Sequence, residues 1–333
     1  MTAAAGRAAP TRHAALDGDP SASPRRFSTH WLGVRLRAIA GPLRGQRLCL
    51  AFSGGLDSSV LLDALVALRR REAFKLRALH VDHGLHADSV RWAAAARNQS
   101  RRLRVSCEIL RIRVAPARGE SLEAVARRER YRALLEQLAD DELLLTAHTQ
   151  DDQLETLLLA LMRGSGVRGL AAMGARSALG RTTLLRPLLP VARSQLEQYA
   201  RARGLKWSED VSNLDERFDR NYLRRQVLPR LRARWPAAAA MASRSASHLA
   251  EAQALLESLA RRGAALAADG VALRVSVLRG MPLPERNNVL RCWLAGRGLS
   301  MPDHRRLREI AGPMLEARAD ALPRVAWRGG ELR

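Results

Sequence analysis

The sequence predicts an α/β protein in which a parallel sheet wrapped by helices is followed by a smaller, mostly helical region. Between residues 47 and 162, short apolar runs alternate with stretches of helical periodicity, and beyond residue 235 the pattern is nearly all helical. With 333 residues, of which 47% are hydrophobic, the chain is long enough for two domains with real cores.

Units of one strand and one helix make up the first region. We expect strands at residues 48–52, 76–81, 105–114 and 142–147, and helices at residues 58–68, 87–103, 121–138 and 151–162. Ser121 is placed to cap the third of these helices. Strict alternation indicates parallel strands, and ligands of such sheets bind beyond the carboxyl ends of the strands. Function is therefore expected just after Phe52, Val81 and Ala147, where polar or glycine-rich residues follow.

The second region comes after a cluster of arginines between residues 217 and 234. Pro229 should interrupt the helix there, because proline lacks a backbone donor and clashes with the preceding turn. Beyond it we expect a long Ala-rich helix closed by Gly263, a short strand at 271–275, and helices at 285–295 and 303–317. The predicted organisation is a disordered extension over residues 1–30, a catalytic domain over 31–235 and a mostly helical domain over 236–333.

The formal charge of +23 points to a polyanionic partner, either nucleic acid or a membrane surface. Almost all of the positive charge is arginine, since Lys75 and Lys206 are the only lysines. A coding bias can explain arginine in place of lysine, but not so large an excess over Asp and Glu. Nucleic acid is the favoured partner, and the aromatic content of 4% argues against binding mainly by stacked bases.

The sequence also lacks signals for a membrane or for export. No apolar run is long enough to span a bilayer, and the Ala-, Ser- and Pro-rich start lacks the apolar stretch of a signal peptide. Cys49, Cys107 and Cys292 lie far apart with no CxxC pair, which is typical of reduced cytosolic thiols and offers no zinc site. We expect a cytoplasmic protein with no membrane partner, and the sequence predicts no oligomeric state.

The strongest motif is a glycine-rich segment between an apolar strand and an apolar helix. Its glycines let the backbone approach a phosphate chain, because no Cβ blocks it, and the following helix directs free N–H groups at that anion. Its serines add hydroxyl donors, and Asp57 is suited to hold Mg²⁺. The segment lacks the lysine of common NTPase loops, and it does not match the GxSxG motif of hydrolases. The alternative to a phosphate-binding loop is a plain glycine turn before a capped helix. The segment reads Ser53-Gly54-Gly55-Leu56-Asp57-Ser58-Ser59.

This segment resembles the SGGxDS signature of the PP-loop ATP pyrophosphatases, matched at Ser53, Gly54, Gly55, Asp57 and Ser58. The resemblance implies a Rossmann-like sheet of the PP-loop type, with ATP as substrate and Mg²⁺ as the metal. Enzymes of this family cleave ATP between the α- and β-phosphates and activate a carbonyl-type oxygen as an adenylate, after which a nucleophile displaces AMP.

Four further segments, in order along the chain, resemble the tRNA(Ile)-lysidine synthases within that family. Together with the glycine-rich motif they span residues 48–231. The segments are His80-Val81-Asp82-His83-Gly84-Leu85, residues 147–156 with His148, Asp151, Asp152 and Glu155, residues 163–170 with Arg163, Gly164, Ser165 and Gly166, and Asp210-Val211-Ser212-Asn213 followed by Arg220, Asn221 and Arg224.

The resemblance implies a two-step reaction on an isoleucine tRNA with the anticodon CAU. The carbon-2 oxygen of the wobble cytidine attacks the α-phosphate of ATP and releases pyrophosphate; free L-lysine then attacks carbon 2 and releases AMP. Because the lysine amine must lose a proton, a carboxylate base is needed, for which Asp151 and Asp152 are candidates. The expected roles are catalysis by Asp57, Asp151 and Asp152, ATP binding by residues 53–59 with His80, Asp82 and His83, further site roles for His148, Glu155, Arg163, Gly164, Ser165 and Gly166, and tRNA binding by Arg217, Arg220, Asn221, Arg224, Arg225 and Arg232.

Each segment also has a plainer interpretation. Asp151 and Asp152 can simply cap a helix, although one residue can cap and bind at once. His83 and His148 can be ordinary polar residues at strand ends. Residues 163–166 can form only a tight turn, and the arginine cluster can be a solvated face, although its near absence of acids favours phosphate contact.

The sequence departs from the family pattern at both ends. The Ala-rich start is not shared, and the further C-terminal domain usual in the family is expected to be absent, because the chain stops at Arg333. One rival is another PP-loop enzyme, such as a tRNA thiolase or an amide-forming synthetase, although the cysteines offer a thiolase no cluster-binding set. The other is a non-catalytic RNA-binding protein with a relict nucleotide site, against which the intact acidic residues argue.

Overall fold

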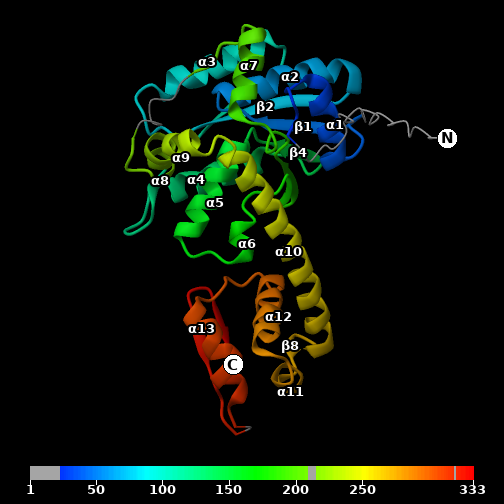
Figure 1. Ribbon diagram of the computed structural model, residues 1–333, viewed down its shortest axis with the longest axis vertical. Helices are drawn as coiled ribbons and strands as arrows, with labels where there is room; N and C mark the ends of the chain where they lie inside the picture. The colour runs from blue at the N-terminus through cyan, green and yellow to red at the C-terminus, as the bar shows by residue number, and fades with distance from the viewer. Residues whose placement is uncertain (1–22, 209–214, 319) are drawn as a thin grey trace, which may run out of the picture. The chain divides into compact units, whose positions relative to one another are not determined.

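The computed structural model describes residues 23–208, 215–318 and 320–333 (Figure 1). The chain divides into two compact units. The first contains the residues up to Ser165 together with Ala172–Ala246, and the second contains Gly166–Ala171 and Ser247–Arg333. None of the described helices is long and apolar enough to cross a membrane.

A six-stranded, mostly parallel sheet forms the centre of the first unit, with strand order β3-β2-β1-β4-β6-β5. The predicted parallel sheet is confirmed for the first four strands, and β6 continues it next to β4. The hairpin of β5 and β6 was not predicted; these strands are antiparallel because only two residues join them, with Gly180 at a φ of +57°. The strands are β1 (Arg47–Ala51), β2 (Lys75–Asp82), β3 (Cys107–Arg111), β4 (Glu142–Leu145), β5 (Arg176–Leu179) and β6 (Thr182–Leu185).

Helices cover both faces of this sheet, which explains why its strands are apolar runs rather than alternating ones. On β1, Leu48 and Leu50 face a core built with α1, α2 and α7, whereas Cys49 faces a second core to which α4 contributes Leu134. The helices of this unit's sheet region are α1 (Thr29–Ala40), α2 (Leu56–Glu72), α3 (Ser89–Arg102), α4 (Leu122–Gln137), α5 (Gln150–Met162) and α7 (Arg193–Ala202).

The folded part of the chain starts earlier than the sequence indicated. Phe27 is only 2% exposed and packs edge-on against the rings of Trp31 and Tyr199. Ser28 caps α1 by accepting a hydrogen bond from the Trp31 N–H. The extension predicted over residues 1–30 therefore overlaps the first unit from Phe27 onward, and residues 1–22 lie outside the described part of the chain.

Three short helical pieces follow one another at the end of the first unit: α8 (Asp219–Tyr222), a π-helical turn (Leu223–Val227) and α9 (Leu228–Arg234). Pro229 lies in the first turn of α9, where its missing N–H has no partner to lose. Regular α-helix is thus interrupted just before Pro229, by a π-helical turn that ends where α9 begins.

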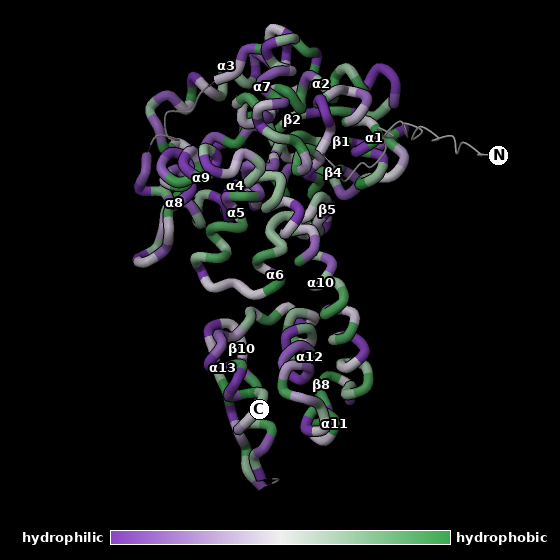
Figure 2. Tube along the Cα trace, viewed as in Figure 1, coloured by the Kyte–Doolittle hydropathy of each residue, from purple (hydrophilic) through white to green (hydrophobic). Residues whose placement is uncertain are grey.

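The second unit is largely helical. The long helix α10 (Ala238–Ala267) enters it from the first unit, and hydrophilic and hydrophobic residues alternate along it (Figure 2). α10 continues past Gly263, so the prediction that this glycine closes the helix is wrong. A Cβ at Gly263 would lie 2.6 Å from Val289 Cγ2 on α12. Glycine here permits close packing of two helices. The remaining elements are α6 (Val167–Leu170), β7 (Ala268–Asp269), β8 (Ala272–Leu273), α11 (Val275–Arg279), α12 (Leu283–Gly296), α13 (His304–Glu309), a π-helical turn (Ile310–Met314), β9 (Val325–Trp327) and β10 (Gly330–Leu332).

A buried arginine holds the core of the second unit together. The Arg286 side chain on α12 donates hydrogen bonds to the backbone carbonyls of Leu278, Arg279, Met281 and Ala311, at 2.6–3.3 Å. These carbonyls come from the end of α11, from Met281 in the turn that follows it, and from the π-helical turn after α13. The guanidinium thus satisfies acceptors that would otherwise be buried without donors.

Candidate active site

The glycine-rich loop connects the end of β1 to the start of α2 and is held by its own hydroxyl groups. Gly54 has a φ of +82°, a conformation that L side chains rarely adopt, and its carbonyl accepts a hydrogen bond from the Ser208 N–H at 3.0 Å. The Ser53 and Ser58 Oγ atoms lie 3.0 Å apart, and Ser58 donates to the Gly55 carbonyl at 3.1 Å. These hydrogen bonds give the loop a defined shape.

The first turn of α2 opens onto this loop. Gly55 occupies the N-cap position and offers no side-chain cap, so N–H groups of the first turn stay available to an anion. The side chain of Leu56 is buried in the core and its share in the loop is backbone only. Ser59 is also buried, and its hydroxyl lies 3.4 Å from the Gly54 carbonyl. Ser58 and Ser59 thus brace the loop, whereas Ser53, which also contacts Ser58, is exposed and can be reached by a ligand.

The residues predicted after β2 support the loop from the side. His80 is buried, and its Nδ1 lies 2.9 Å from the carbonyl of Phe52, the last residue before the loop. Burial lowers the pKa of His80, so the ring is neutral at pH 7. The Asp82 carboxylate accepts a hydrogen bond from the Gly84 N–H at 2.9 Å, and His83 is half-buried beside it. These residues shape the end of β2 next to the loop.

Asp57 has one carboxylate oxygen without a hydrogen-bond partner among the described residues. This buried atom is Oδ1, while Oδ2 lies 3.9 Å from Nη1 of Arg193 at the start of α7. Burial raises the pKa of Asp57 to about 6, with Arg193 opposing and Asp152 and Asp151 adding to the shift. An unpaired carboxylate oxygen beside a phosphate cradle is the donor that Mg²⁺ prefers.

Asp57 would therefore hold Mg²⁺ together with phosphate oxygens rather than within a protein cage. No cluster of three or more His, Cys, Asp or Glu side chains suited to a metal occurs in the part of the chain that the structure describes. Mg²⁺ is commonly bound by one or two carboxylates plus substrate phosphates, and the residues present fit that pattern.

Asp151 connects three helices. Its Oδ1 accepts a hydrogen bond from Arg232 Nη2 at 2.5 Å, and its Oδ2 accepts one from the backbone N–H of Arg193 at 2.9 Å. Asp151 lies on α5, Arg193 on α7 and Arg232 on α9. Both oxygens of this carboxylate have partners that fix the packing of the helices around the loop.

Asp152 and Glu155 share one arginine. The Arg224 side chain donates to Glu155 Oε1 at 2.6 Å through Nε and to Asp152 Oδ1 at 3.0 Å through Nη2. Asp152 Oδ2 also accepts a hydrogen bond from the Thr149 N–H at 2.8 Å, so this residue caps α5 and pairs with Arg224 at once. Arg220 approaches the other oxygen of Glu155 at 3.8 Å.

The two carboxyl groups respond differently to burial. Burial opposes ionisation of Asp152, but the charge of the Arg224 guanidinium and the hydrogen bonds from Thr149 outweigh it and hold its pKa below the usual range. Burial raises the pKa of Glu155 despite Arg224, because its side chain is only 3% exposed. The site therefore contains one carboxylate held ionised and one carboxyl that is easier to protonate.

His148 lies beside Asp152 at the end of β4. Its Nδ1 is 2.8 Å from Thr146 Oγ1, and burial lowers its pKa so that the imidazole is neutral at pH 7. The guanidinium groups of Arg130, Arg186 and Arg127 lower that pKa further. We did not single out these arginines from the sequence; the only signal is that Arg127 and Arg130 lie three residues apart on one face of the predicted helix.

Residues 163–166 form the end of α5 and the turn after it. Arg163 Nε donates to the Leu159 carbonyl at 3.0 Å, the Ser165 N–H to the Ala160 carbonyl at 3.0 Å, and Gly164 has a φ of +67°. A Cβ at Gly164 or Gly166 would meet nothing within 4 Å. The turn explains Gly164, and a role for this segment in ligand binding stays a prediction.

The arginines expected to bind tRNA have carboxylate partners in the structure. The sequence did not predict these pairs, because most of the acids lie on other helices. The other two acids, Asp215 and Glu216, lie just before the arginine cluster. Asn221 donates to the Asp215 carbonyl at 2.9 Å, and Asp210–Asn213 lie outside the described residues. A tRNA contact for these residues stays a prediction. The pairs are Arg217 with Asp215, Arg220 with Glu123, Arg225 with Glu216, Arg224 with Asp152 and Glu155, and Arg232 with Asp151.

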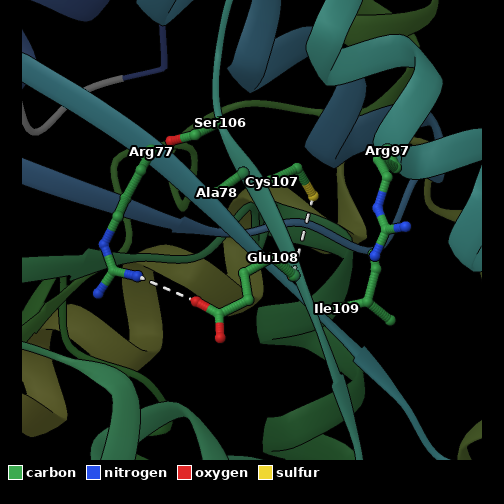
Figure 3. Close-up of a pocket in the computed structure, with 7 residues that line it drawn as sticks. All are labelled: Arg77, Ala78, Arg97, Ser106, Cys107, Glu108 and Ile109. Atoms are coloured by element: carbon green, nitrogen blue, oxygen red, sulfur yellow. Dashed lines mark hydrogen bonds and ion pairs between the residues drawn. The ribbon is translucent and has the colours of Figure 1, made fainter.

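One hollow on the first unit lies away from these residues (Figure 3). It has a volume of about 500 Å³ and sits at the start of the edge strand β3. Arg77 and Arg97 lie on opposite sides of that strand, so the hollow wraps around an open sheet edge. It holds none of the predicted site residues and is not the candidate active site. Its lining is Arg77, Ala78, Arg97, Ser106, Cys107, Glu108 and Ile109.

Comparison with known proteins identifies the family. A model of the PP-loop domain matches residues 30–231, and a model of the TilS substrate binding domain matches residues 273–333. The chain is 44% identical over 314 residues to a tRNA(Ile)-lysidine synthase of Alkalilimnicola ehrlichii, covering 94% of this chain and 69% of that protein. The chain belongs to the family of tRNA(Ile)-lysidine synthases.

Other members of the family agree. The tRNA(Ile)-lysidine synthase of Coxiella burnetii is 41% identical over 90% of this chain and 66% of its own length, and that of Pseudomonas aeruginosa is 44% identical over 90% and 69%. The chain spans about two thirds of the length of these relatives. The predicted family, its ATP-binding PP-loop domain and its class of ATP-dependent ligases are thereby confirmed.

A solved structure of another protein shares the fold. It is described as U34-tRNA thiolase NcsA from Methanococcus maripaludis with its [4Fe-4S] cluster. Its TM-score is 0.52 at 16% identity, and the match covers 66% of this chain and 78% of that one. At this identity the likeness confirms the predicted fold class and says nothing about chemistry.

Proposed function

We propose that this chain modifies tRNA(Ile) by joining free L-lysine to the wobble cytidine of the anticodon CAU, with cleavage of ATP to AMP and pyrophosphate. The observation that carries the proposal is the cradle of Gly54, Gly55 and the first turn of α2, with Asp57 beside it. Its membership of the tRNA(Ile)-lysidine synthase family supports the substrate.

The cradle would bind the phosphates of ATP through backbone N–H groups. Gly54 and Gly55 present no Cβ to the phosphate chain, and Ser53 adds an exposed hydroxyl donor. Mg²⁺, when bound by Asp57, would neutralise charge on the phosphates. Donors fixed in place before the reaction stabilise the charge that develops during phosphoryl transfer.

Asp152 is the better candidate for the base that deprotonates lysine. Asp151 connects α5, α7 and α9 through both of its oxygens, which is a positioning role. Asp152 lies next to the neutral imidazole of His148 and is held ionised by Arg224, so it can attract an ammonium group and accept a proton. Glu155 lies on the same face of α5, one turn further along.

The proposed tRNA partner fits the charge of the protein. A formal charge of +23 favours binding to a phosphate backbone, and the target base lies in a single-stranded loop, where splaying it out costs little. Arg230 and Arg234 lie on α9 and form no ion pair within the described ranges, so they are the members of the arginine cluster most open to phosphates. Since the proposed substrates are tRNA and free lysine, we infer that the enzyme works in the cytoplasm.

The cysteines do not favour a sulfur-transfer reaction. Burial raises the pKa of Cys49 to about 12, and burial also raises the pKa of Cys107. A thiol is a nucleophile only as thiolate, so neither group is activated at pH 7. A tRNA thiolase is therefore the weaker alternative for this chain.

The test is mass spectrometry of a tRNA(Ile) transcript after incubation with the protein, ATP and lysine. We expect a nuclease fragment containing the wobble cytidine to gain the mass of one condensed lysine, with AMP and pyrophosphate formed in equal amounts. Omission of lysine, and a tRNA(Met) transcript with the same anticodon CAU, are the controls. Formation of ADP and phosphate, or an unchanged tRNA after complete turnover conditions, would overturn the proposal.

A further inference from the structure

A group of cations crowds the edge of the sheet opposite the candidate active site. At this edge β1 and β2 begin and helices α2 and α3 end, so it lies at the amino ends of the strands. All of its cationic side chains are exposed except Arg69, which is half-buried. We call the group the amino-edge patch; it consists of Arg44, Arg69, Arg70, Arg71, Lys75, Arg101, Arg102 and Arg104.

Printed contacts bring the turns that carry these residues together. The turn after Arg44 is joined to the end of α2 by a hydrogen bond from the Gly45 N–H to the Ala73 carbonyl at 3.1 Å. Arg69 on α2 reaches the backbone carbonyl of Arg104, beyond α3, at 3.5 Å. The patch is therefore one continuous surface of the first unit, formed by segments up to 60 residues apart in the sequence.

The acids of this edge do not neutralise the patch. Each nearby carboxylate pairs with an arginine outside it, and none of the patch residues pairs with a carboxylate within residues 23–208, 215–318 and 320–333. The patch thus has a local excess of positive charge that the described part of the chain leaves uncompensated. The pairs are Glu72 with Arg37, Asp141 with Arg47, Glu142 with Arg77 and Asp140 with Arg181.

Helix stability explains only part of this pattern. Cations in the last turn of a helix interact favourably with its dipole, which accounts for some of the arginines that end α2 and α3. Arg44, Lys75 and Arg104 lie outside helices, and each added like charge raises the repulsion within the patch. A polyanion bound here would relieve that repulsion.

We propose that the amino-edge patch binds the phosphate backbone of RNA, independently of base sequence and of the lysine-joining reaction. All eight residues of the patch are arginine or lysine, so it has no aromatic ring to stack on bases. It would therefore contact the phosphates of the RNA backbone. None of the large exposed hydrophobic residues of the described chain lies within the patch, whereas a surface that binds membranes inserts such residues. RNA is therefore the polyanion that the surface fits.

The test compares two triple variants that lose the same charge. Arg70→Gln/Arg101→Gln/Arg102→Gln removes patch cations, and Arg128→Gln/Arg132→Gln/Arg324→Gln removes exposed arginines that pair with carboxylates elsewhere. Binding of an unmodified tRNA that is not a substrate is measured by fluorescence anisotropy over a series of salt concentrations. Thermal unfolding confirms that both variants fold.

We expect the slope of log K against log salt to fall by about 2–3 for the patch variant, since each lost phosphate contact contributes about 0.9. The control variant should change the slope by less than about 1. Equal changes in the two variants would overturn the proposal. Flotation of the wild-type protein, but not the patch variant, with phosphatidylglycerol vesicles at an unchanged RNA slope would overturn it in favour of a membrane.

Lysidine formation is measured on the same preparations to separate the two proposals. If the patch variant has the smaller salt slope but the wild-type protein makes no lysidine, the RNA-binding patch is supported and the proposed function is refuted. If lysidine forms normally and both triple variants have the same salt slope, the proposed function is supported and the RNA-binding patch is refuted.

Discussion

Arg224 pairs with Glu155, whose carboxyl is buried in the candidate site, and Arg224 Nε lies 2.6 Å from Glu155 Oε1. The pair joins residues 69 positions apart and is made from a π-helical turn, Leu223–Val227. Such turns occur frequently at functional sites because they redirect side chains. Here the turn aims the Arg224 guanidinium at Glu155 and Asp152 together.

Removing Arg224 should make stability depend on pH. Burial raises the pKa of Glu155 even with Arg224 present, and Arg224→Gln should raise it further. A carboxyl whose pKa is higher in the folded state stabilises the fold below its unfolded pKa and loses that contribution as pH rises through the folded pKa. We expect the free energy of unfolding of Arg224→Gln to be about 2 kcal/mol lower than that of wild type at pH 7, and the difference to be smaller at pH 4. The value is reduced to allow for the partial exposure of Arg224.

Urea unfolding at pH 4 and pH 7 measures this difference. The double variant Arg224→Gln/Glu155→Gln lacks the Glu155 carboxyl and is the control, in which the extra pH dependence should shrink to the part that Asp152 contributes. If the single and double variants show the same pH dependence, Glu155 is not the titrating group.

Asp57→Asn should leave the fold intact and stop ATP consumption. The Oδ1 atom of Asp57 makes no hydrogen bond among the described residues, and Oδ2 has only the distant Arg193 guanidinium at 3.9 Å. The amide therefore gives up one weak ion pair inside the protein, but it loses the charge that would hold Mg²⁺. We expect the rate of AMP and pyrophosphate release to fall at least about a hundredfold, as is typical for loss of one contact in the transition state. A folded variant with near-normal turnover would remove Asp57 from the proposed mechanism.

The two loop glycines should respond differently to alanine. Gly54 has a φ of +82°, so Gly54→Ala strains the backbone and should cost about 1–2 kcal/mol of stability. Gly55 has a φ of −77°, and a Cβ there would meet Ser53 Oγ at an ordinary 3.5 Å. Gly55→Ala should therefore fold normally and raise KM for ATP, because the methyl group occupies the approach of the phosphates. Comparable losses of stability in the two variants would contradict this assignment of the loop.

Asp151 and Asp152 should separate into a positioning role and a catalytic role. Asp151→Asn weakens the pair with Arg232 and should lower stability by about 1 kcal/mol with a small effect on kcat, since asparagine still accepts one hydrogen bond. Asp152→Asn should lower kcat for lysidine formation by about a hundredfold at an unchanged rate of tRNA binding. Single-turnover kinetics with preformed tRNA complex gives the two values, and the opposite order of effects would exchange the roles.

Arg286→Met should loosen the second unit. The side chain donates to four backbone carbonyls and is only 9% exposed, so methionine leaves these acceptors unsatisfied. We expect a loss of about 3 kcal/mol, visible as faster hydrogen exchange of residues 278–281 and 310–315. Arg291→Met changes an exposed arginine of the same helix and should have little effect. Equal exchange in both variants would show that the carbonyls find other donors.

Local patterns in the sequence determined the parallel strands, the helices between them and the glycine-rich loop. Periodicity reports which face of an element is buried, and Gly54 is required by its own φ, so neither inference needs information from distant residues. Where a distant residue decides the outcome, as Val289 does for Gly263, the local reading failed.

Only the tertiary structure decided how the charges of the site are paired. Asp151 meets Arg232 across 81 positions and Asp152 meets Arg224 across 72, and no periodicity connects such residues. From sequence, an arginine cluster is simply positive; once folded, most of its members serve carboxylates, while the amino-edge patch serves none in the described chain. The physical reason is that electrostatic pairing depends on distance in space, which the order of residues along a chain does not specify.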